Sequence, residues 1–171
     1  MTLNVGLNNL YPTDVMLSKI DIKQEHVDHG IMSVIHPELN QIVVDIFDNY
    51  IRSTLPNETI DSWDYKIQGW VNRYHLNEME YHTHSGAALS AVVYLINDAE
   101  GGEITFYDPR HFAARGYDMK FRPLFDPTSY KPQAGDVVTF PSYLYHAVRP
   151  TKGLRISAAF DLYLADKEVK E

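Results

Sequence analysis

Two histidines placed two positions apart are the first feature of this sequence that could do chemistry. They lie in the segment Glu80-Tyr81-His82-Thr83-His84, whose residue types and surroundings favour a strand. Because successive side chains of a strand alternate between its two faces, His82 and His84 point to the same side, and Glu80 can join them. Two imidazoles on one face can chelate a metal ion, provided that another strand supplies a third ligand.

The candidate for that third ligand is His146, which follows a strongly hydrophobic run and opens another predicted strand. The chain contains no cysteine, so a transition-metal site must use imidazole and carboxylate groups. A lone histidine in a strand is more often a structural residue than a ligand, but this pair together with a distant third histidine favours a metal site. We interpret the remaining histidines as surface or local capping residues: His26, His29, His36, His75 and His111.

An arginine that follows His146 indicates what the metal would act with. In Leu154-Arg155-Ile156-Ser157, strand alternation places Arg155 and Ser157 on one face. A guanidinium that points into a barrel needs an anion, since an unpaired buried charge is very costly, and arginine binds carboxylates through two parallel hydrogen bonds. A metal at the barrel mouth with such an arginine inside describes a site for a bidentate 2-oxo acid. The alternative is an outward-facing Arg155 paired with a surface acid.

The elements that must position these residues change in character along the chain. Helical periodicity predicts helices near 21–35 and 38–55, the second bracketed by Pro37 and Pro56. After Ser62, short runs of β-branched and aromatic residues alternate with turns, which is typical of all-β folds. The predicted strands lie near 64–75, 80–84, 88–96, 103–107, 118–122, 136–140, 144–149 and 154–164.

We therefore predict a single domain over residues 1–171, mainly β with N-terminal helices. Residues 1–60 form a helical support, and residues 61–165 form a catalytic core of the double-stranded β-helix type, a jelly-roll or cupin-like barrel. The segment 108–132 contains four prolines, which restrict regular backbone hydrogen bonding. We expect it to be a long loop that acts as a substrate lid or wall.

Composition and charge narrow the function classes. The 171 residues carry a formal net charge of −8 without a run of Lys or Arg, so a nucleic-acid partner is not expected. No apolar stretch is long enough to span a bilayer, and the N-terminus lacks the basic and apolar regions of a secretory signal. We expect a cytoplasmic protein, monomeric or homodimeric, that does not act at a membrane.

Several motifs, taken in order, resemble one enzyme family. The motifs are Arg73-Tyr74 ahead of the first histidine, Tyr94-Leu95 leading to Asn97, Gly-Gly-Glu-Ile-Thr-Phe at 101–106, Pro-Gln-Ala-Gly-Asp at 132–136, and then Phe140, His146, Arg155 and Ser157. Over the stretch from Trp70 to Leu164 they resemble the Fe(II)/2-oxoglutarate-dependent dioxygenases. The resemblance is closest to the prolyl 4-hydroxylase-like branch and related small bacterial and phage oxygenases.

The resemblance implies that His82, His84 and His146 bind Fe(II). The usual metal triad of this family is His-x-Asp/Glu followed by a distant His, so the histidine at position 84 departs from it. Either the site is a three-histidine iron centre, which we favour, or His84 stands behind an acid such as Glu80 or Asp108 that binds the metal. The sequence His-Thr-His-Ser-Gly also resembles the His-Thr-His-Pro-Gly motif of a subset of these oxygenases.

The resemblance also implies the co-substrates, 2-oxoglutarate and O2. Arg155 would hold the C5 carboxylate of 2-oxoglutarate, with Tyr94 and Ser157 as hydrogen-bond partners, and Asn72 or Tyr74 would contact the chelating end. The expected reaction is hydroxylation of an unactivated C–H bond in a small molecule or peptide, such as a peptidyl proline or another amino-acid residue.

Two other functions remain open from the residues alone. One is a metal-dependent cupin enzyme that does not use 2-oxoglutarate, because Gly135, Pro141 and His146 resemble part of the second cupin motif. The glutamate that the first cupin motif requires after the histidine pair is absent. The other is a metal-free jelly-roll protein that binds a partner or sugar, which would suit the 12 tyrosines but leave the histidine and arginine pattern unexplained.

Overall fold

The structure is a computed structural model that describes residues 6–8, 37–74, 78–108 and 126–167. The predicted helix near 21–35 and the predicted strand near 118–122 lie outside these residues. Most of the predicted lid over 108–132 lies outside them as well.

Helix α2 spans Pro37–Thr54 and confirms the helix predicted at 38–55. Proline suits the first turn of a helix, where its missing N–H would have no intrahelical partner. One stripe of the helix is buried, as the spacing of three and four residues requires: Val43, Ile46, Phe47, Tyr50 and Ile51. On its other side, an Asp48 carboxylate oxygen accepts the backbone N–H of Ile60 at 2.8 Å and so joins α2 to the short 3-10 helix η2, Ile60–Ser62.

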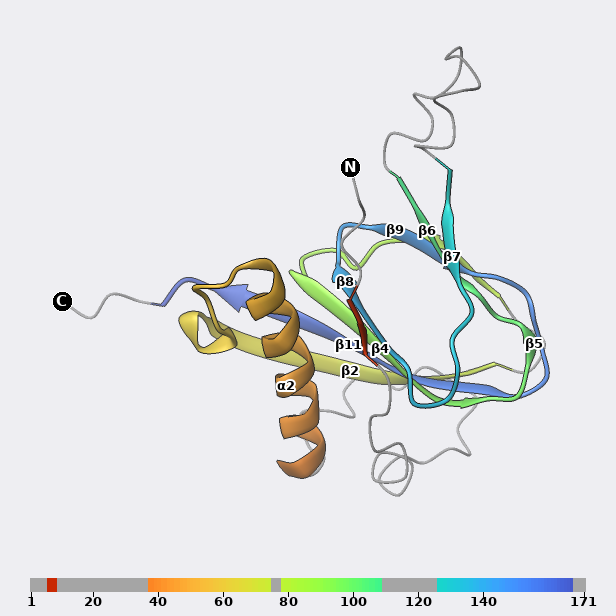
Figure 1. Ribbon diagram of the computed structural model, residues 1–171, viewed down its shortest axis with the longest axis horizontal. Coiled ribbons are helices and arrows are strands. Elements are labelled where there is room, and N and C mark those ends of the chain that lie inside the picture. The colour runs from red at the N-terminus through yellow and green to blue at the C-terminus, as the bar shows by residue number, and fades with distance from the viewer. Residues whose placement is uncertain (1–5, 9–36, 75–77, 109–125, 168–171) are drawn as a thin grey trace, which may run out of the picture.

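The larger sheet has five antiparallel strands in the order β1-β8-β4-β11-β2. In that order, the strands span Gly6–Asn8, Val137–Pro141, Leu89–Asn97, Arg155–Ala165 and Asp64–Tyr74. Helix α2 packs on the outer face of this sheet (Figure 1), against outward side chains such as Val93, Ala158 and Phe160. The other face of the sheet is covered as well, so strand β4 is buried on both sides and is apolar at almost every position.

The smaller sheet has four antiparallel strands in the order β3-β9-β6-β7. They span Met79–His82, Tyr145–Val148, Ile104–Tyr107 and Thr128–Tyr130, and a separate pair joins β10, Thr151–Lys152, to β5, Glu100–Gly101. A second core fills the space between the sheets: Val92, Tyr94, Ile104, Phe106, Val138, Phe140, Leu144 and Ala159. Successive strands β2, β3, β4, β6, β8, β9 and β11 alternate between the two sheets, as in a jelly roll, and the predicted fold class is confirmed.

Two local predictions were wrong. Strand β3 ends at His82, so His84 follows the strand rather than lying in it. Residues 128–130 of the predicted loop form β7, which pairs with β6. A strand this short is too short to show an alternating pattern in the sequence, and it is recognised only by its hydrogen bonds to β6.

A pair of glycines lies beside the side chain of Arg155. Gly101 and Gly102 have φ angles of +76° and +73°, which favour glycine. A Cβ atom on Gly102 would lie 3.2 Å from Cδ of Arg155, closer than ordinary packing allows. The glycine at position 102 therefore leaves space for the stem of the arginine side chain.

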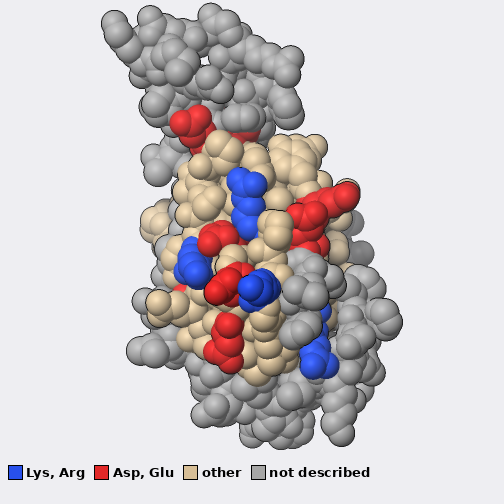
Figure 2. All heavy atoms as spheres, turned by 90° about the vertical axis from the view of Figure 1, so that its right-hand side faces the viewer, with Lys and Arg blue, Asp and Glu red and all other residues tan. Residues whose placement is uncertain are grey.

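On the face of the molecule that carries β5, basic and acidic side chains are interspersed (Figure 2). Lys152 Nζ, for example, lies 3.9 Å from a carboxylate oxygen of Glu100 across the β10–β5 pair. The described residues of this face form no extended patch of a single sign. Among the described residues there is also no helix with the length and apolar character needed to cross a membrane.

Candidate active site

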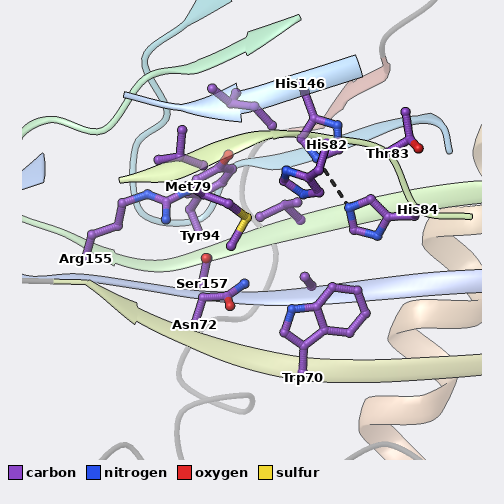
Figure 3. Close-up of a pocket in the computed structure, with 14 residues that line it drawn as sticks. Trp70, Asn72, Met79, His82, Thr83, His84, Tyr94, His146, Arg155 and Ser157 are labelled. Atoms are coloured by element: carbon purple, nitrogen blue, oxygen red, sulfur yellow. Dashed lines mark hydrogen bonds between the residues drawn. The ribbon is translucent and has the colours of Figure 1, made fainter. Parts of the chain in front are cut away.

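His82, His84 and His146 converge between the two sheets, and one nitrogen of each ring lies within 4.8 Å of those of the other two. His82 on β3 and His146 on β9 are direct cross-strand neighbours. His84 reaches the same point from the turn after β3, where its backbone N–H donates to the Ser142 carbonyl at 3.1 Å. Figure 3 shows the three rings together at one end of a cavity. The predicted cluster therefore forms although one member lies outside the strand.

Two of the three rings donate from Nδ1 to a backbone carbonyl two residues earlier. His82 Nδ1 lies 2.7 Å from the Glu80 oxygen, and His146 Nδ1 lies 2.9 Å from the Leu144 oxygen. A carbonyl oxygen only accepts hydrogen bonds, so Nδ1 of each ring carries a proton. In the neutral form of each ring, Nε2 then has a free lone pair directed at the cluster.

His84 uses a carboxylate in place of a carbonyl. Its Nδ1 lies 2.8 Å from one carboxylate oxygen of Asp161 and 2.9 Å from the other, so it too carries its proton on Nδ1. The Nε2 atoms of His84 and His146 are 3.3 Å apart, and when both rings are neutral with the proton on Nδ1 their lone pairs face each other. Such lone pairs repel unless a cation lies between them. Two nitrogens bound at right angles, about 2.1 Å from a metal, would lie about 3 Å apart, so this donor set fits a divalent transition metal.

Burial favours the neutral, metal-binding form of two of these rings. Desolvation lowers the pKa of His146, which is 3% exposed, to about 3, and the adjacent rings of His82 and His84 act in the same direction. Desolvation is also the main cause that lowers the pKa of His82. Because a metal binds only the unprotonated nitrogen, protons compete little for these two ligands near neutral pH.

Asp161 is a site residue that the sequence did not single out. It lies on β11, is 5% exposed, and accepts a hydrogen bond from the Ser90 hydroxyl at 2.7 Å besides its contact with His84. The strand alternation that places Arg155 and Ser157 on one face also places residue 161 there, so a signal was present. Its partner His84 lies 77 positions earlier in the chain, and only the assembled sheets bring the two together.

A cavity of about 310 Å³ extends from the histidines to Arg155 (Figure 3). Arg155 is 1% exposed and is the only one of its 14 lining residues with a permanent charge, so the outward-facing alternative for this arginine was wrong. The guanidinium carbon lies 5.0 Å from the ring centroid of Tyr94. The rest of the lining is apolar or uncharged: Trp70, Asn72, Met79, Thr83, Val92, Tyr94, Ile104, Val148, Ser157 and Ala159.

Three of the predicted co-substrate contacts form one row across the larger sheet. Ser157 on β11 pairs with Tyr94 on β4 and with Asn72 on β2, and all three are buried. A register shift next to Ser157 pairs Ile156 with residue 96 and Ser157 with residue 94, as in a β-bulge. The row therefore lies on the same wall of the cavity as Arg155.

The other proposed residues are Tyr74, Glu80 and Asp108. Tyr74 pairs with Arg155 through the backbone of β2, and its side chain lies outside the described part. Glu80 is exposed and contributes its carbonyl rather than its carboxylate to the site. Among the described residues, the potential metal-binding group consists of the three histidines and includes neither Glu80 nor Asp108.

Comparison with known sequences gives one family. Residues 68–161, more than half of the 171-residue chain, match the 2OG-Fe(II) oxygenase family, in which 2OG stands for 2-oxoglutarate. The matched stretch runs from β2 to Asp161 and contains the three histidines and Arg155. No curated protein matches the chain.

Solved structures share the fold at low sequence identity. A prolyl-4-hydroxylase from Pseudomonas putida has a TM-score of 0.66 at 15% identity, covering 97% of this chain and 90% of that chain. A 2OG-Fe(II) oxygenase family oxidoreductase from Burkholderia pseudomallei has a TM-score of 0.65 at 15% identity, covering 93% and 84%. HygX from Streptomyces hygroscopicus, solved with nickel and 2-oxoglutarate bound, has a TM-score of 0.62 at 13% identity, covering 95% and 82%.

The family match decides between the function classes that the residues left open. It supports neither a cupin enzyme without 2-oxoglutarate nor a metal-free binding protein. The family uses Fe(II), 2-oxoglutarate and O2, so the predicted enzyme class and cofactors are confirmed at the level of the family. This chain belongs to the 2OG-Fe(II) oxygenase family.

Proposed function

We propose that this protein is an Fe(II)- and 2-oxoglutarate-dependent hydroxylase in which His82, His84 and His146 hold the iron. One observation carries the proposal. Three ring nitrogens lie close together at one end of a cavity, and a buried arginine lies at the other end. A cation would bind the nitrogens at the first end, and a dicarboxylate could reach from that cation to the arginine at the other end.

Arg155 holds the C5 carboxylate of 2-oxoglutarate in this proposal. A buried guanidinium is stabilised by an anion that forms two parallel hydrogen bonds with it. Tyr94 and Ser157 lie next to it on the cavity wall and offer hydroxyl groups. Asn72, in the same cross-strand row, or Tyr74 at the end of β2 contacts the chelating end of the molecule.

Bound iron would supply the oxidant by coupling O2 activation to the oxidative decarboxylation of 2-oxoglutarate. The overall reaction consumes R–H, 2-oxoglutarate and O2, and it yields R–OH, succinate and CO2. The chain's own residues contribute orientation and the exclusion of water. Apolar side chains such as Val92, Ile104 and Val148 line the cavity between the two ends and leave few polar groups to hold water there.

The substrate in this proposal is a peptidyl proline or another uncharged amino-acid residue. Beyond the histidines and Arg155, no described residue that lines the cavity offers a charge to a substrate. An apolar wall with Trp70 beside the histidines suits a pyrrolidine ring. The prolyl-4-hydroxylase from Pseudomonas putida, which shares the fold, makes peptidyl proline the first substrate to examine.

Anaerobic titration with Fe(II) tests the metal assignment. We expect one Fe(II) per chain, and a large loss of affinity in each of His82→Ala, His84→Ala and His146→Ala. His84→Asp is the informative companion, since it restores two histidines and one carboxylate. Full iron affinity and turnover in His84→Ala would show that His84 is not a ligand.

Succinate release tests the reaction and the substrate class. Proline-containing peptides, matched peptides with alanine in place of proline, free amino acids and nucleotides are each incubated with Fe(II), 2-oxoglutarate and O2. We expect substrate-dependent succinate and a product heavier by one oxygen atom for proline peptides only. Equal succinate release with the alanine peptides would reject peptidyl proline while leaving the iron and 2-oxoglutarate assignments in place.

A further inference from the structure

Asp161 and Ser90 form a hydrogen-bond chain behind the ring of His84. Asp161 is 5% exposed and Ser90 is 1% exposed. The Ser90 hydroxyl donates to a carboxylate oxygen of Asp161 at 2.7 Å, and the hydroxyl oxygens of Ser90 and Ser142 are also 2.7 Å apart. Because the Ser90 hydrogen goes to the carboxylate, Ser142 donates to Ser90. The chain of donors ends on Asp161, which receives the N–H of His84 from the other side.

His84 is held by its backbone and by its ring face as well. Its backbone N–H donates to the Ser142 carbonyl at 3.1 Å. The Trp70 ring stacks on the imidazole with centroids 5.5 Å apart and planes inclined by 25°, and Figure 3 shows it along one side of the cluster. The ring of His84 is therefore oriented by the protein itself, with Nδ1 toward Asp161 and Nε2 toward the other histidines.

This arrangement differs from that of the other two histidines. His82 and His146 each donate Nδ1–H to a neutral backbone carbonyl, whereas His84 donates to a carboxylate. The common metal triad of non-haem Fe(II) oxygenases has two histidines and one carboxylate. Here an imidazole occupies the third position, and a carboxylate stands directly behind it.

We infer that Asp161 is a positioning residue for the metal: it holds the proton of His84 on Nδ1, leaves the Nε2 lone pair for the metal, and places behind His84 the negative charge that a carboxylate ligand would otherwise bring. The inference rests on the proposed function, because it requires that His84 binds the metal. A carboxylate behind a metal-bound histidine makes the ligand more basic, and its loss typically weakens metal binding about 10–100-fold.

Asp161→Asn tests the inference with almost no change in volume. The new amide can donate to Nδ1 of His84 and so favour the form with the proton on Nε2, in which Nε2 has no lone pair for the metal. Long-range proton–nitrogen NMR of the metal-free proteins reads the tautomer directly. We expect the proton of His84 on Nδ1 in the wild type and a shift toward Nε2 in Asp161→Asn. Calorimetric titration with Co(II) should show affinity about 10–100-fold weaker in the variant.

Asp136→Asn is the matched control, because Asp136 is also a buried aspartate with hydrogen-bonded partners. Its carboxylate accepts from the Tyr130 hydroxyl at 2.6 Å and from the Gln133 backbone at 2.7 Å. This variant should lower thermal stability and leave Co(II) affinity unchanged. Ser90→Ala keeps the charge of Asp161 but removes one of its hydrogen bonds, so we expect Co(II) affinity about three- to tenfold weaker.

A double variant separates a role through His84 from a merely structural one. In a His84→Asp background the carboxylate binds directly, so adding Asp161→Asn should cost no further Co(II) affinity. An equal loss of Co(II) affinity in both backgrounds would overturn the inference. A wild-type His84 with its proton on Nε2 would also overturn it, and this NMR result does not depend on the folding of any variant. If His84→Ala loses Co(II) affinity while Asp161→Asn does not, the inference fails and the proposed metal site stands. If His84→Ala binds Co(II) normally, the proposed site itself fails.

Discussion

The two faces of strand β11 serve different purposes, and residues that alternate along the strand belong to opposite faces. One face packs against α2 and the outer core through Ile156, Ala158, Phe160 and Leu162. The other face lies toward the smaller sheet and carries Arg155, Ser157, Ala159 and Asp161. A shift of one residue along this strand therefore exchanges a packing position for a site position. The separation allows substitutions on neighbouring residues to test stability and ligand binding independently.

The largest effect on stability should come from Phe160→Ala. Phe160 is 1% exposed in the outer core, and truncating a buried phenylalanine costs about 3–5 kcal/mol. Urea unfolding measures the loss. Co(II) affinity of the folded protein, measured at low temperature, should match the wild type. A loss of Co(II) affinity without a loss of stability would show that the two faces are not separate.

Arg155→Ala should have the converse effect. Removing a buried guanidinium that pairs with a carboxylate should weaken 2-oxoglutarate binding by about 2–5 kcal/mol. The charge-transfer absorption of the anaerobic Fe(II) complex, titrated with 2-oxoglutarate, measures this. Fe(II) affinity in the absence of 2-oxoglutarate should remain near the wild-type value. Unchanged 2-oxoglutarate affinity in this variant would remove Arg155 from the co-substrate site.

His146 in the candidate site should also make the free energy of unfolding depend on pH. The folded pKa of His146 is lowered to about 3, whereas the unfolded chain binds this proton near pH 6.5. The unfolded state therefore binds more protons between these values, and metal-free protein loses stability as pH falls below about 6.5. By pH 4.5 the loss from this residue should reach roughly 2–3 kcal/mol.

Urea unfolding in the presence of a chelator, at pH 7.5, 6.0 and 4.5, checks this dependence against a His146→Gln variant. The variant keeps a polar side chain, but glutamine does not bind a proton in this pH range. Its free energy of unfolding should therefore fall less steeply as the pH is lowered. Parallel curves for the two proteins would assign the whole acid effect to other groups.

Ser157→Ala should have the smallest effect. Loss of one hydroxyl contact should weaken 2-oxoglutarate binding by about 0.5–1.5 kcal/mol and leave stability nearly unchanged. The matched variant on the other face is Ala158→Ser, which places a hydroxyl among the apolar side chains next to α2. That variant should cost about 1–3 kcal/mol of stability and nothing in 2-oxoglutarate affinity. If the two variants have the same pattern of effects, the contrast between the faces of β11 does not hold.

Much of the arrangement was accessible from local patterns. Alternating and continuous apolar runs located strands β2, β4, β8 and β11 to within a few residues. The same alternation placed Arg155 and Ser157 on one face. By contrast, β7 is three residues long and gave no periodic signal, and the end of β3 at His82 depends on the turn that ties His84 to Ser142.

The sequence by itself determined which residues could bind a metal and a 2-oxo acid, because histidine spacing and strand alternation are local properties of the chain. Only the tertiary structure decided how they are held. The contact between His84 and Asp161 joins positions 77 residues apart, and it exists because β11 lies beside β4 within the larger sheet and faces the turn after β3. The low pKa of His146 likewise follows from burial between two sheets, which no residue type or spacing states in advance.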